Sequence, residues 1–569
     1  MASDPVRTDA TDDDERGDFF DVSSPAVLGA NPFVGLSARQ MMASLSRLLR
    51  HLGARPGVIA RETVLLGRDL TVIAAGRTPI TPPRSDKRWS DPAWSENPVY
   101  KRLQQSYLAY CAAVGRAIAS AGLDRKSELR GRYATGILTE ALAPTNSPVN
   151  PAVLKRLFDT SGKSAVTGVG HFLSDLVKHR GMPTTVDRRP FGVGESVAVS
   201  PGGVVFRNDV LEVLQYTPTT PQAREIPLLF VPPQINKFYI LDLAPGRSFT
   251  EYAVGRGIPF FTVSWRNPTP AQRDWDLSTY AGAVLEATEA VRAIAGTDTL
   301  NLLGLCAGGM TVSALLGHLA ATGQLNRVPS ATFLVTMIDT SGPSQIGDLA
   351  SQPVVDEAIE KARRKGVFSG ADMERGFAWL RPSDLVWNYV VNNWLLGKEP
   401  PAFDVLAWNA DTTELPAALY EQFVQLYRGN QLRQPGGMTV LGTPLDLGKV
   451  DIDTYSIAGV TDHIVSWKAA YEMTNIFSGP VEFVLSNSGH IQALVNPPGN
   501  PKASLRVGGR QSGDAEQWLA TSREVRGSWW EHWCEWILAR SGAERPAPES
   551  LGDADHPVLM PAPGSYVLG

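Results

Sequence analysis

Short apolar runs alternate with helical patterns along this chain from about Asn208 onward. Each run is aliphatic or β-branched and is bounded by turn residues, as in strands that are buried on both faces. Longer segments with helical periodicity, such as 277–295, lie between several of them. The alternation predicts an α/β fold with a mostly parallel sheet covered by helices on both faces. The predicted strands are 227–231, 259–265, 300–305, 331–338, 454–458 and 481–485.

Helical periodicity dominates the earlier part of the chain, over 31–194. Ser37 and Gln40 have the spacing of a capping box, and apolar residues then recur at helical intervals over 41–52. A second segment of this kind is 100–119. We therefore expect several helices before the sheet begins.

These two hydrophobic patterns predict a mainly helical N-terminal domain over 26–205, followed by a catalytic domain over 206–569. A polar, proline-rich connector at 77–98 is expected to be irregular. Residues 1–25 are strongly acidic and predict a disordered tail. The tail after Ser541 is rich in proline and acidic residues, which predicts an extended segment.

Composition limits the function classes. The 569 residues exceed what one compact core usually holds, in agreement with more than one domain. A formal net charge of −5 argues against nucleic acid as the main partner. The acidic N-terminus has no apolar core of a secretory signal, and no apolar stretch is long enough to span a bilayer. We expect a cytoplasmic protein with no transmembrane segment.

The cysteine content also indicates a cytoplasmic protein. Cys111, Cys306 and Cys534 are too few for a disulfide framework in a chain of this length, and they fit a reducing cytosol. No CxxC pair or His/Cys cluster has zinc spacing, so we predict no metal. Cys111 and Cys534 lie in apolar helical patterns, which indicates core packing.

Cys306 lies in a different context, within Gly304-Leu305-Cys306-Ala307-Gly308. This G-x-C-x-G segment has the form of the nucleophile elbow of α/β-hydrolases, with cysteine in the usual place of serine. A predicted strand leads in and a helical run, 310–319, leads out, which is the context that the motif requires. Small flanking residues are needed because the turn is sharp. We predict an α/β-hydrolase fold with Cys306 as an acyl-accepting nucleophile.

The remaining catalytic residues should follow in the order acid, then histidine. Asp462 follows the fifth predicted strand and His490 follows the sixth, so both fall at the carboxyl edge of the sheet, where such sites form. We assign Asp462 as the acid that orients the imidazole and His490 as the base that takes the thiol proton. Asp339, after the fourth strand, is a rival acid, and His463 is a rival base.

An oxyanion hole requires two backbone N–H donors. One is expected from Ala307, the residue after the nucleophile, and the other from the loop after the first parallel strand, where we nominate Ile235. The tryptophan-rich segment between the fourth and fifth predicted strands lies where α/β-hydrolases insert a cap over the active site. We therefore predict a cap insertion at about 340–453.

Several longer segments stand out along the chain: DKRWSDPAWSENP (86–98), VPPQINKFYILDL (231–243), SWRNP (264–268), LLGLCAGG (302–309), DLVWNYVVNNWLLG (384–397), AGVTDHIVSW (458–467) and SGHIQALVNPPGNPKA (488–503). Together they resemble polyhydroxyalkanoate synthases, from about residue 30 to the C-terminus. The segments are closer to those of the single-subunit synthases of medium-chain monomers (class II) than to those of short-chain monomers (class I), and monomer length stays open. Gln234 departs from some members, which carry cysteine there.

The resemblance implies an acyltransferase that polymerises (R)-3-hydroxyacyl-CoA into polyhydroxyalkanoate and releases CoA. Its catalytic cysteine, aspartate and histidine map onto Cys306, Asp462 and His490. It also implies that the polymer chain and its granule surface are partners, that the enzyme is a homodimer, and that no cofactor is needed, because coenzyme A is part of the substrate and the product.

Two other functions stay open at this point. A cysteine-type hydrolase of esters or lactones would share the same catalytic residues, and a granule-coat scaffold would need none of them. Two amphipathic segments, the helix at 41–52 and the tryptophan-rich helix near 529–536, are candidates for contact with the polymer surface. Packing within the protein is the simpler interpretation of each.

Overall fold

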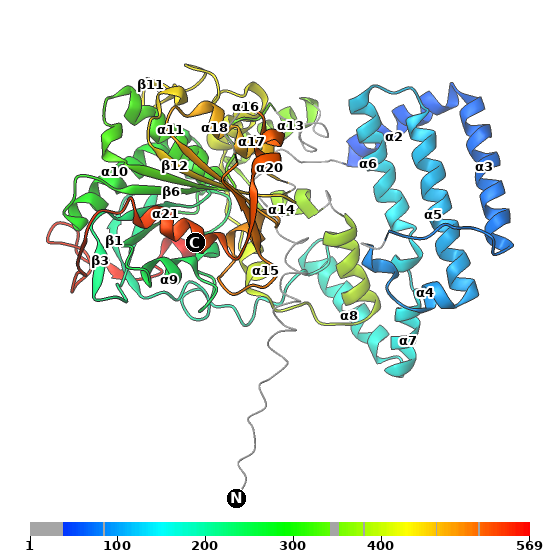
Figure 1. The fold of residues 1–569 in the computed structure, drawn as a ribbon. Coiled ribbons are helices and arrows are strands. Elements are labelled where there is room, and N and C mark those ends of the chain that lie inside the picture. The colour runs from blue at the N-terminus through cyan, green and yellow to red at the C-terminus, as the bar shows by residue number, and fades with distance from the viewer. Residues whose placement is uncertain (1–37, 84–85, 342–351, 379–381, 463, 510–512) are drawn as a thin grey trace, which may run out of the picture.

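The computed structural model describes residues 38–83, 86–341, 352–378, 382–462, 464–509 and 513–569. The predicted tail at 1–25 and the capping residue Ser37 lie outside the described residues. Helices occupy the N-terminal part and a large sheet follows them, as expected (Figure 1). The N-terminal helices are α2 (Ala38–Gly53), α3 (Pro56–Ala74), α4 (Ala93–Glu96), α5 (Pro98–Ala119), α6 (Arg125–Ala141), α7 (Pro151–Asp159) and α8 (Lys163–Lys178).

The connector at 77–98 is more ordered than predicted. It holds the 3-10 turn η1 (Lys87–Trp89) and the short helix α4. Trp89 and Trp94 are buried there and pack edge to face, with ring centroids 4.8 Å apart. The polar residues around these two tryptophans made the connector look irregular from its composition, so their packing was not predicted.

All the predicted strands form, and they are the parallel centre of the sheet. In spatial order they are β5 (Phe260–Trp265), β4 (Leu228–Val231), β6 (Asn301–Leu305), β7 (Ser330–Leu334), β12 (Asp453–Gly459) and β13 (Val481–Ser486). Their carboxyl ends therefore share one edge. β7 is shorter than predicted because Val335, with φ of 43°, leaves the extended conformation.

Antiparallel strands extend the sheet at both sides to eleven strands among the described residues. Beyond β5 lie β2 (Leu211–Tyr216), β1 (Gly202–Arg207) and β17 (Met560–Pro561). Beyond β13 lie β14 (Ser504–Val507) and β15 (Arg523–Arg526). The extended C-terminal tail thus supplies an edge strand, and the buried carboxylate of Glu212 accepts hydrogen bonds from the N–H groups of Ser565 and Tyr566 at 2.9 and 3.0 Å.

Helices cover both faces of the sheet (Figure 1). On one face, α10 (Leu277–Ala295) and α11 (Ala307–Ala321) pack on alternate strand residues such as Leu302. On the other, α9 (Phe249–Val254) and α21 (Trp529–Leu538) pack on neighbouring residues such as Leu303. The tryptophans of α21 at positions 529, 530 and 533 are at most 2% exposed, so this helix belongs to the core rather than to a polymer-binding surface.

The segment between β7 and β12 lies where the cap insertion was expected, and the N-terminal part docks onto it. Its helical elements are α13 (Gln352–Lys365), α14 (Gly370–Ala378), the π-helical turns η6 (Ser383–Trp387) and η7 (Val390–Leu395), α15 (Asp404–Asn409), α16 (Ala417–Gly429) and the 3-10 turn η8 (Leu447–Lys449). Its short strands are β8 (Val367–Phe368), β9 (Leu415–Pro416), β10 (Thr439–Val440) and β11 (Thr443–Pro444). Helix α8 packs along η7, and the buried carboxylate of Asp175 accepts a hydrogen bond from Trp394 Nε1 at 2.7 Å.

Gly168 makes this docking possible, because a Cβ atom at this position would collide with the carbonyl oxygen of Trp394. We predict that Gly168→Ala lowers the free energy of unfolding by about 1–3 kcal/mol, the usual cost of overpacking. Gly170 lies on the same helix with open space around it, so Gly170→Ala should be neutral or stabilising by up to about 1 kcal/mol through helix propensity. Denaturant unfolding of both variants measures the contrast, and an equal effect of the two would contradict it.

Candidate active site

Cys306 lies at the sharp turn between β6 and α11, as the motif predicts. Its backbone angles are φ 50° and ψ −114°, a strained combination for a residue with a side chain. Its neighbours explain why glycine surrounds it. A Cβ atom on Gly304 would lie 2.6 Å from the Cα of Gly309, and one on Gly308 would collide with the carbonyl oxygens of Val231 and Pro232. The glycines let the elbow fit closely against β4.

Asp462 and His490 meet at the carboxyl ends of β12 and β13. His490 Nδ1 and Asp462 Oδ2 are 2.6 Å apart, and both side chains are almost fully buried. The other carboxylate oxygen of Asp462 accepts hydrogen bonds from the N–H groups of Ile464 and Val465, at 2.8 and 2.9 Å. The carboxylate is therefore fixed, and so is the ring that it holds.

The charge environment joins Cys306 to this pair. Burial alone would lower the pKa of His490, but the carboxylate of Asp462 and a hydrogen bond with the Cys306 thiol outweigh it and raise that pKa to about 10. The carboxylate therefore favours the charged form of the ring once the ring has taken up a second proton. The arrangement can therefore carry the thiol proton on the ring and leave a nucleophilic sulfur.

Two backbone N–H groups near the elbow have no hydrogen-bond acceptor among the described residues. They are those of Ala307, at the start of α11, and Ile235, in the loop after β4. The loop itself is held at its start by Trp265 Nε1, which donates to the carbonyl of Pro232 at 2.9 Å. These two N–H groups are the ones nominated for an oxyanion hole, and both remain available to a ligand.

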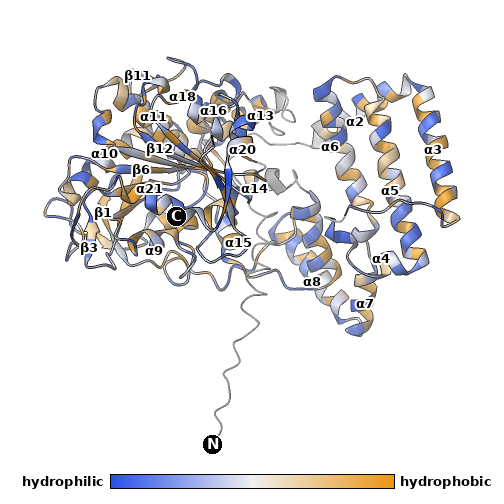
Figure 2. Ribbon diagram, viewed as in Figure 1, coloured by the Kyte–Doolittle hydropathy of each residue, from blue (hydrophilic) through white to orange (hydrophobic). Residues whose placement is uncertain are grey.

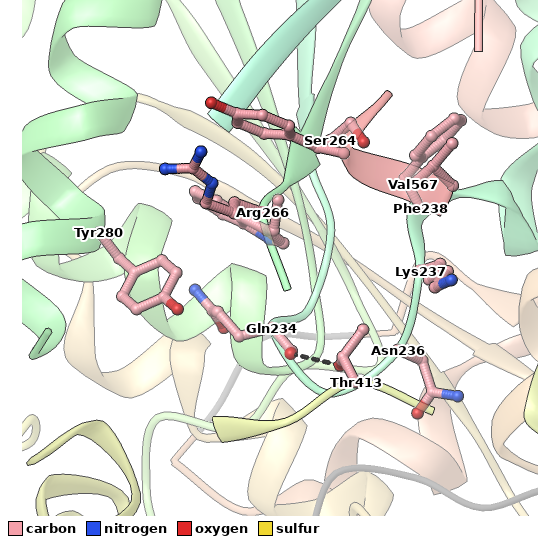
Figure 3. A pocket seen from close by; sticks show the side chains of 11 residues that line it. Gln234, Asn236, Lys237, Phe238, Ser264, Arg266, Tyr280, Thr413 and Val567 are labelled. Atoms are coloured by element: carbon pink, nitrogen blue, oxygen red, sulfur yellow. Dashed lines mark hydrogen bonds between the residues drawn. The ribbon is translucent and has the colours of Figure 1, made fainter. Parts of the chain in front are cut away.

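A pocket lies beside the same loop (Figure 3). Two buried polar atoms that line it, Gln234 Oε1 and Asn236 Nδ2, have no partner among the described residues. The pocket is lined by Gln234, Asn236, Lys237, Phe238, Ser264, Trp265, Arg266, Tyr280, Thr413, Tyr566 and Val567.

Known proteins match this chain over nearly its whole length. Poly(3-hydroxyalkanoate) polymerases 1 and 2 of Ectopseudomonas oleovorans are 44% and 46% identical to it, over 96% and 95% of this chain and 97% and 96% of their own. The poly(3-hydroxyalkanoate) polymerase subunit PhaC of Cupriavidus necator is 38% identical over 87% of this chain and 85% of its own. The chain belongs to the poly(3-hydroxyalkanoate) polymerase family.

Two family descriptions divide the polymerase sequence. Residues 85–253 match "Poly-beta-hydroxybutyrate polymerase (PhaC) N-terminus", and residues 238–497 match "alpha/beta hydrolase fold". The second range contains Cys306, Asp462 and His490, and it agrees with the strand order described above. The chain is therefore an enzyme with an α/β-hydrolase fold, as the sequence predicts.

The rival acid of this polymerase lies in another environment. Asp339 is buried, and it accepts hydrogen bonds from Arg433, from Asn430 Nδ2 at 2.9 Å and from the N–H of Ser341 at 2.7 Å. Burial would raise its pKa, but these partners lower it overall. It serves the junction between β7 and the cap segment and has no described contact with His490. The rival base, His463, lies outside the described residues.

One residue of the insertion between β7 and β12 is linked electrostatically to this site, which sequence reasoning missed. Burial raises the pKa of Tyr427, from α16, and the charges of Cys306 and Asp462 raise it further. Its phenol therefore stays protonated at neutral pH. A tyrosine in a long insertion, far along the chain from Cys306, gives no local signal of this interaction.

Metal-binding clusters and membrane-spanning helices are both absent from the part of the chain that the structure describes. In that part of the polymerase, no group of three or more His, Cys, Asp or Glu side chains is placed to hold a metal ion. Within the same residues, no helix combines the length and the hydrophobicity needed to cross a membrane.

Proposed function

We propose that this enzyme polymerises (R)-3-hydroxyacyl-CoA through a covalent thioester on Cys306. In the first step the sulfur of Cys306 attacks the acyl carbonyl, and its proton passes to His490. The negative oxygen that develops accepts hydrogen bonds from the N–H groups of Ala307 and Ile235. The bond to the coenzyme A sulfur then breaks, and the imidazolium returns the proton to give free CoA.

In the second step a 3-hydroxyl group attacks the thioester. His490 takes the hydroxyl proton, the new ester forms, and the Cys306 thiol is restored. Exchange of one thioester for another is nearly balanced in energy, so the acyl group stays activated until the alcohol arrives. Conversion of the thioester to the more stable oxoester then drives the reaction forward, which a serine nucleophile would not achieve.

The observation that carries this proposal is the buried contact of 2.6 Å between His490 and Asp462, with Cys306 near enough to raise the pKa of the same ring. The relatives' names, poly(3-hydroxyalkanoate) polymerase, supply the product class. The cap segment contributes to the same chemistry, because excluding water favours attack by alcohol over hydrolysis. No cofactor takes part in either step.

One experiment tests the function. The purified enzyme is incubated with 3-hydroxybutyryl-CoA and, separately, with 3-hydroxydecanoyl-CoA, while CoA release and insoluble polymer are measured. Polymer formed together with CoA supports the proposal, and the preferred substrate gives the monomer length. CoA release with free hydroxy acid would show a cysteine-type hydrolase instead, and no release from either substrate would favour a scaffold.

We also propose that the enzyme works in the cytoplasm on the surface of its polymer granules, as a homodimer. Helix α8 supports the granule contact, because its polar face is buried and its apolar face is exposed. Ser164, Gly168 and Asp175 point inward, whereas the outward side chains are as much as 82% exposed. Figure 2 shows hydrophobic and hydrophilic residues interleaved along this helix. The outward set is Val166, Val169, Leu173, Leu176 and Val177, and Phe172 at its edge packs edge to face against Trp394.

Charges on this face should detach the enzyme from polymer. We predict that the double variant Leu173→Glu/Leu176→Glu reduces co-sedimentation with polyester particles by about tenfold or more, because burying each leucine contributes about 1.5–3 kcal/mol. CoA release from soluble substrate should be unchanged. Val64→Glu/Val99→Glu, at exposed positions on α3 and α5, is the matched control and should sediment like the wild type. Equal sedimentation of the two double variants would contradict the role of α8.

A further inference from the structure

The loop after β4, residues 232–237, is held from two sides. On the inner side, Gln234 Nε2 donates to Thr311 Oγ1 at 2.9 Å, and this hydroxyl donates to the carbonyl of Ala307 at 3.3 Å. Gln234 and Thr311 are both buried. The loop that carries Ile235 is thus tied to the first turn of α11, which carries Ala307.

On the outer side the partner is Thr413 from the cap segment. Its Oγ1 hydroxyl lies between two carbonyl oxygens and donates its one proton in a bond shared between them, to Gln234 at 2.8 Å, the bond drawn in Figure 3, and to Ile235. Its N–H donates to the carbonyl of Ile235 at 3.2 Å. The neighbouring residue Thr412 pairs with Asn236 in an antiparallel bridge.

The contact with Gln234 has a direct consequence for Ile235, because the two share one peptide group. A peptide unit is planar and trans, so its C=O and N–H point in opposite directions. A hydrogen bond that fixes the carbonyl of Gln234 therefore fixes the direction of the N–H of Ile235. Polarisation of the carbonyl also strengthens that N–H as a donor.

We propose that Thr413 is a positioning residue that aims the N–H of Ile235 at the oxyanion of the acyl-transfer step. The proposal rests on the proposed function, in which Ile235 is one of the two oxyanion donors. Because Thr413 belongs to the segment between β7 and β12, the oxyanion hole is complete only when this part of the cap lies against the loop. The cap thereby takes part in the chemistry itself, in addition to excluding water.

The test compares three variants. Thr413→Val keeps the shape and the backbone N–H but removes the hydroxyl, Thr413→Ser keeps the hydroxyl, and Thr412→Val is the matched control at the adjacent position. Removing one oxyanion donor costs about 10²–10³ in kcat, so misaligning one should lower the kcat of Thr413→Val by about 10- to 100-fold, with KM within about threefold of the wild type. Thr413→Ser and Thr412→Val should stay within about threefold in both constants.

Hydrogen exchange provides a second measurement that does not depend on turnover. The peptide containing residues 232–240 should exchange faster in Thr413→Val than in the wild type or Thr413→Ser. A wild-type kcat in Thr413→Val, unchanged exchange of this peptide, or equal losses in Thr413→Val and Thr412→Val would overturn the proposal. Intact-mass detection of acyl-Cys306 in the wild type distinguishes a failure of the role of Thr413 from a failure of the proposed function. If wild-type Cys306 is acylated and Thr413→Val is acylated at the same rate, only the role of Thr413 fails, whereas no acylation of the wild type would remove the proposed function as well.

Discussion

Polymer formation should fall by at least about 10³-fold when Cys306 is replaced by alanine, because both proposed steps pass through its sulfur. The elbow geometry should persist, since alanine is smaller than cysteine at a position where the neighbouring glycines already provide the space. Cys306→Ser should also lose polymer formation by a similar factor. Its hydroxyl is a much weaker acid than the thiol, and an acyl-serine would be an oxoester without the driving force of a thioester.

CoA release and insoluble polymer measure the effect, with the folded state checked by circular dichroism. Cys111→Ser is the matched control, because Cys111 lies half-buried on α5 in the N-terminal part. It should keep wild-type turnover. Turnover of Cys306→Ala within tenfold of the wild type would refute the assignment of the nucleophile.

The centre of the fold could be predicted because buried parallel strands are uniformly apolar. Segments such as 227–231 and 300–305 can be recognised as buried strands from the local sequence alone. The edge strands carry no such signal. β15 reads Arg-Glu-Val-Arg and is mostly exposed, β1 begins with two glycines, and β17 spans only Met560–Pro561. Their pairing depends on strands that lie elsewhere in the chain, which local patterns do not reveal.

Within the site, too, only the residues that directly follow parallel strands could be predicted from the sequence. Asp462 and His490 could be found because each directly follows a parallel strand, and the carboxyl ends of such strands converge. Thr413 and Tyr427 come from the insertion between β7 and β12, so the contact of Thr413 with the loop after β4 and the electrostatic link of Tyr427 to the site depend on how that insertion packs. The sequence of the insertion indicates helices and many tryptophans but does not show which of its side chains approach the site.

Helix α8 shows that a hydrophobic pattern alone does not reveal which face of a helix is buried. The helix is amphipathic, and an amphipathic helix ordinarily turns its apolar face inward. Here the docking partner η7 presents Asn393 and Trp394, whose hydrogen bonds select the polar face of α8. The apolar face is left outside, and only the tertiary structure shows that it is available to a partner.

Replacing Asp462 by asparagine should reduce kcat by about 10³–10⁴-fold while leaving the fold intact, because the amide forces the wrong tautomer on His490. The N–H groups of Ile464 and Val465 require an acceptor, so the amide oxygen of the new side chain should face them and its NH₂ group should face His490 Nδ1. That ring nitrogen must then accept, which places the single proton of the neutral ring on Nε2. A protonated Nε2 cannot take the proton of Cys306.

The matched control for this variant is Asp339→Asn, at the rival acid. Its partners are Arg433, Asn430 and Ser341, so it should lower stability and leave kcat within about threefold. Histidine titration by NMR adds a readout besides activity. Burial opposes a charge on His490 and the carboxylate of Asp462 supports it, so Asp462→Asn should lower the pKa of His490 from about 10, and Asp339→Asn should not. A large loss of kcat in Asp339→Asn together with normal turnover in Asp462→Asn would reverse the assignment of the acid.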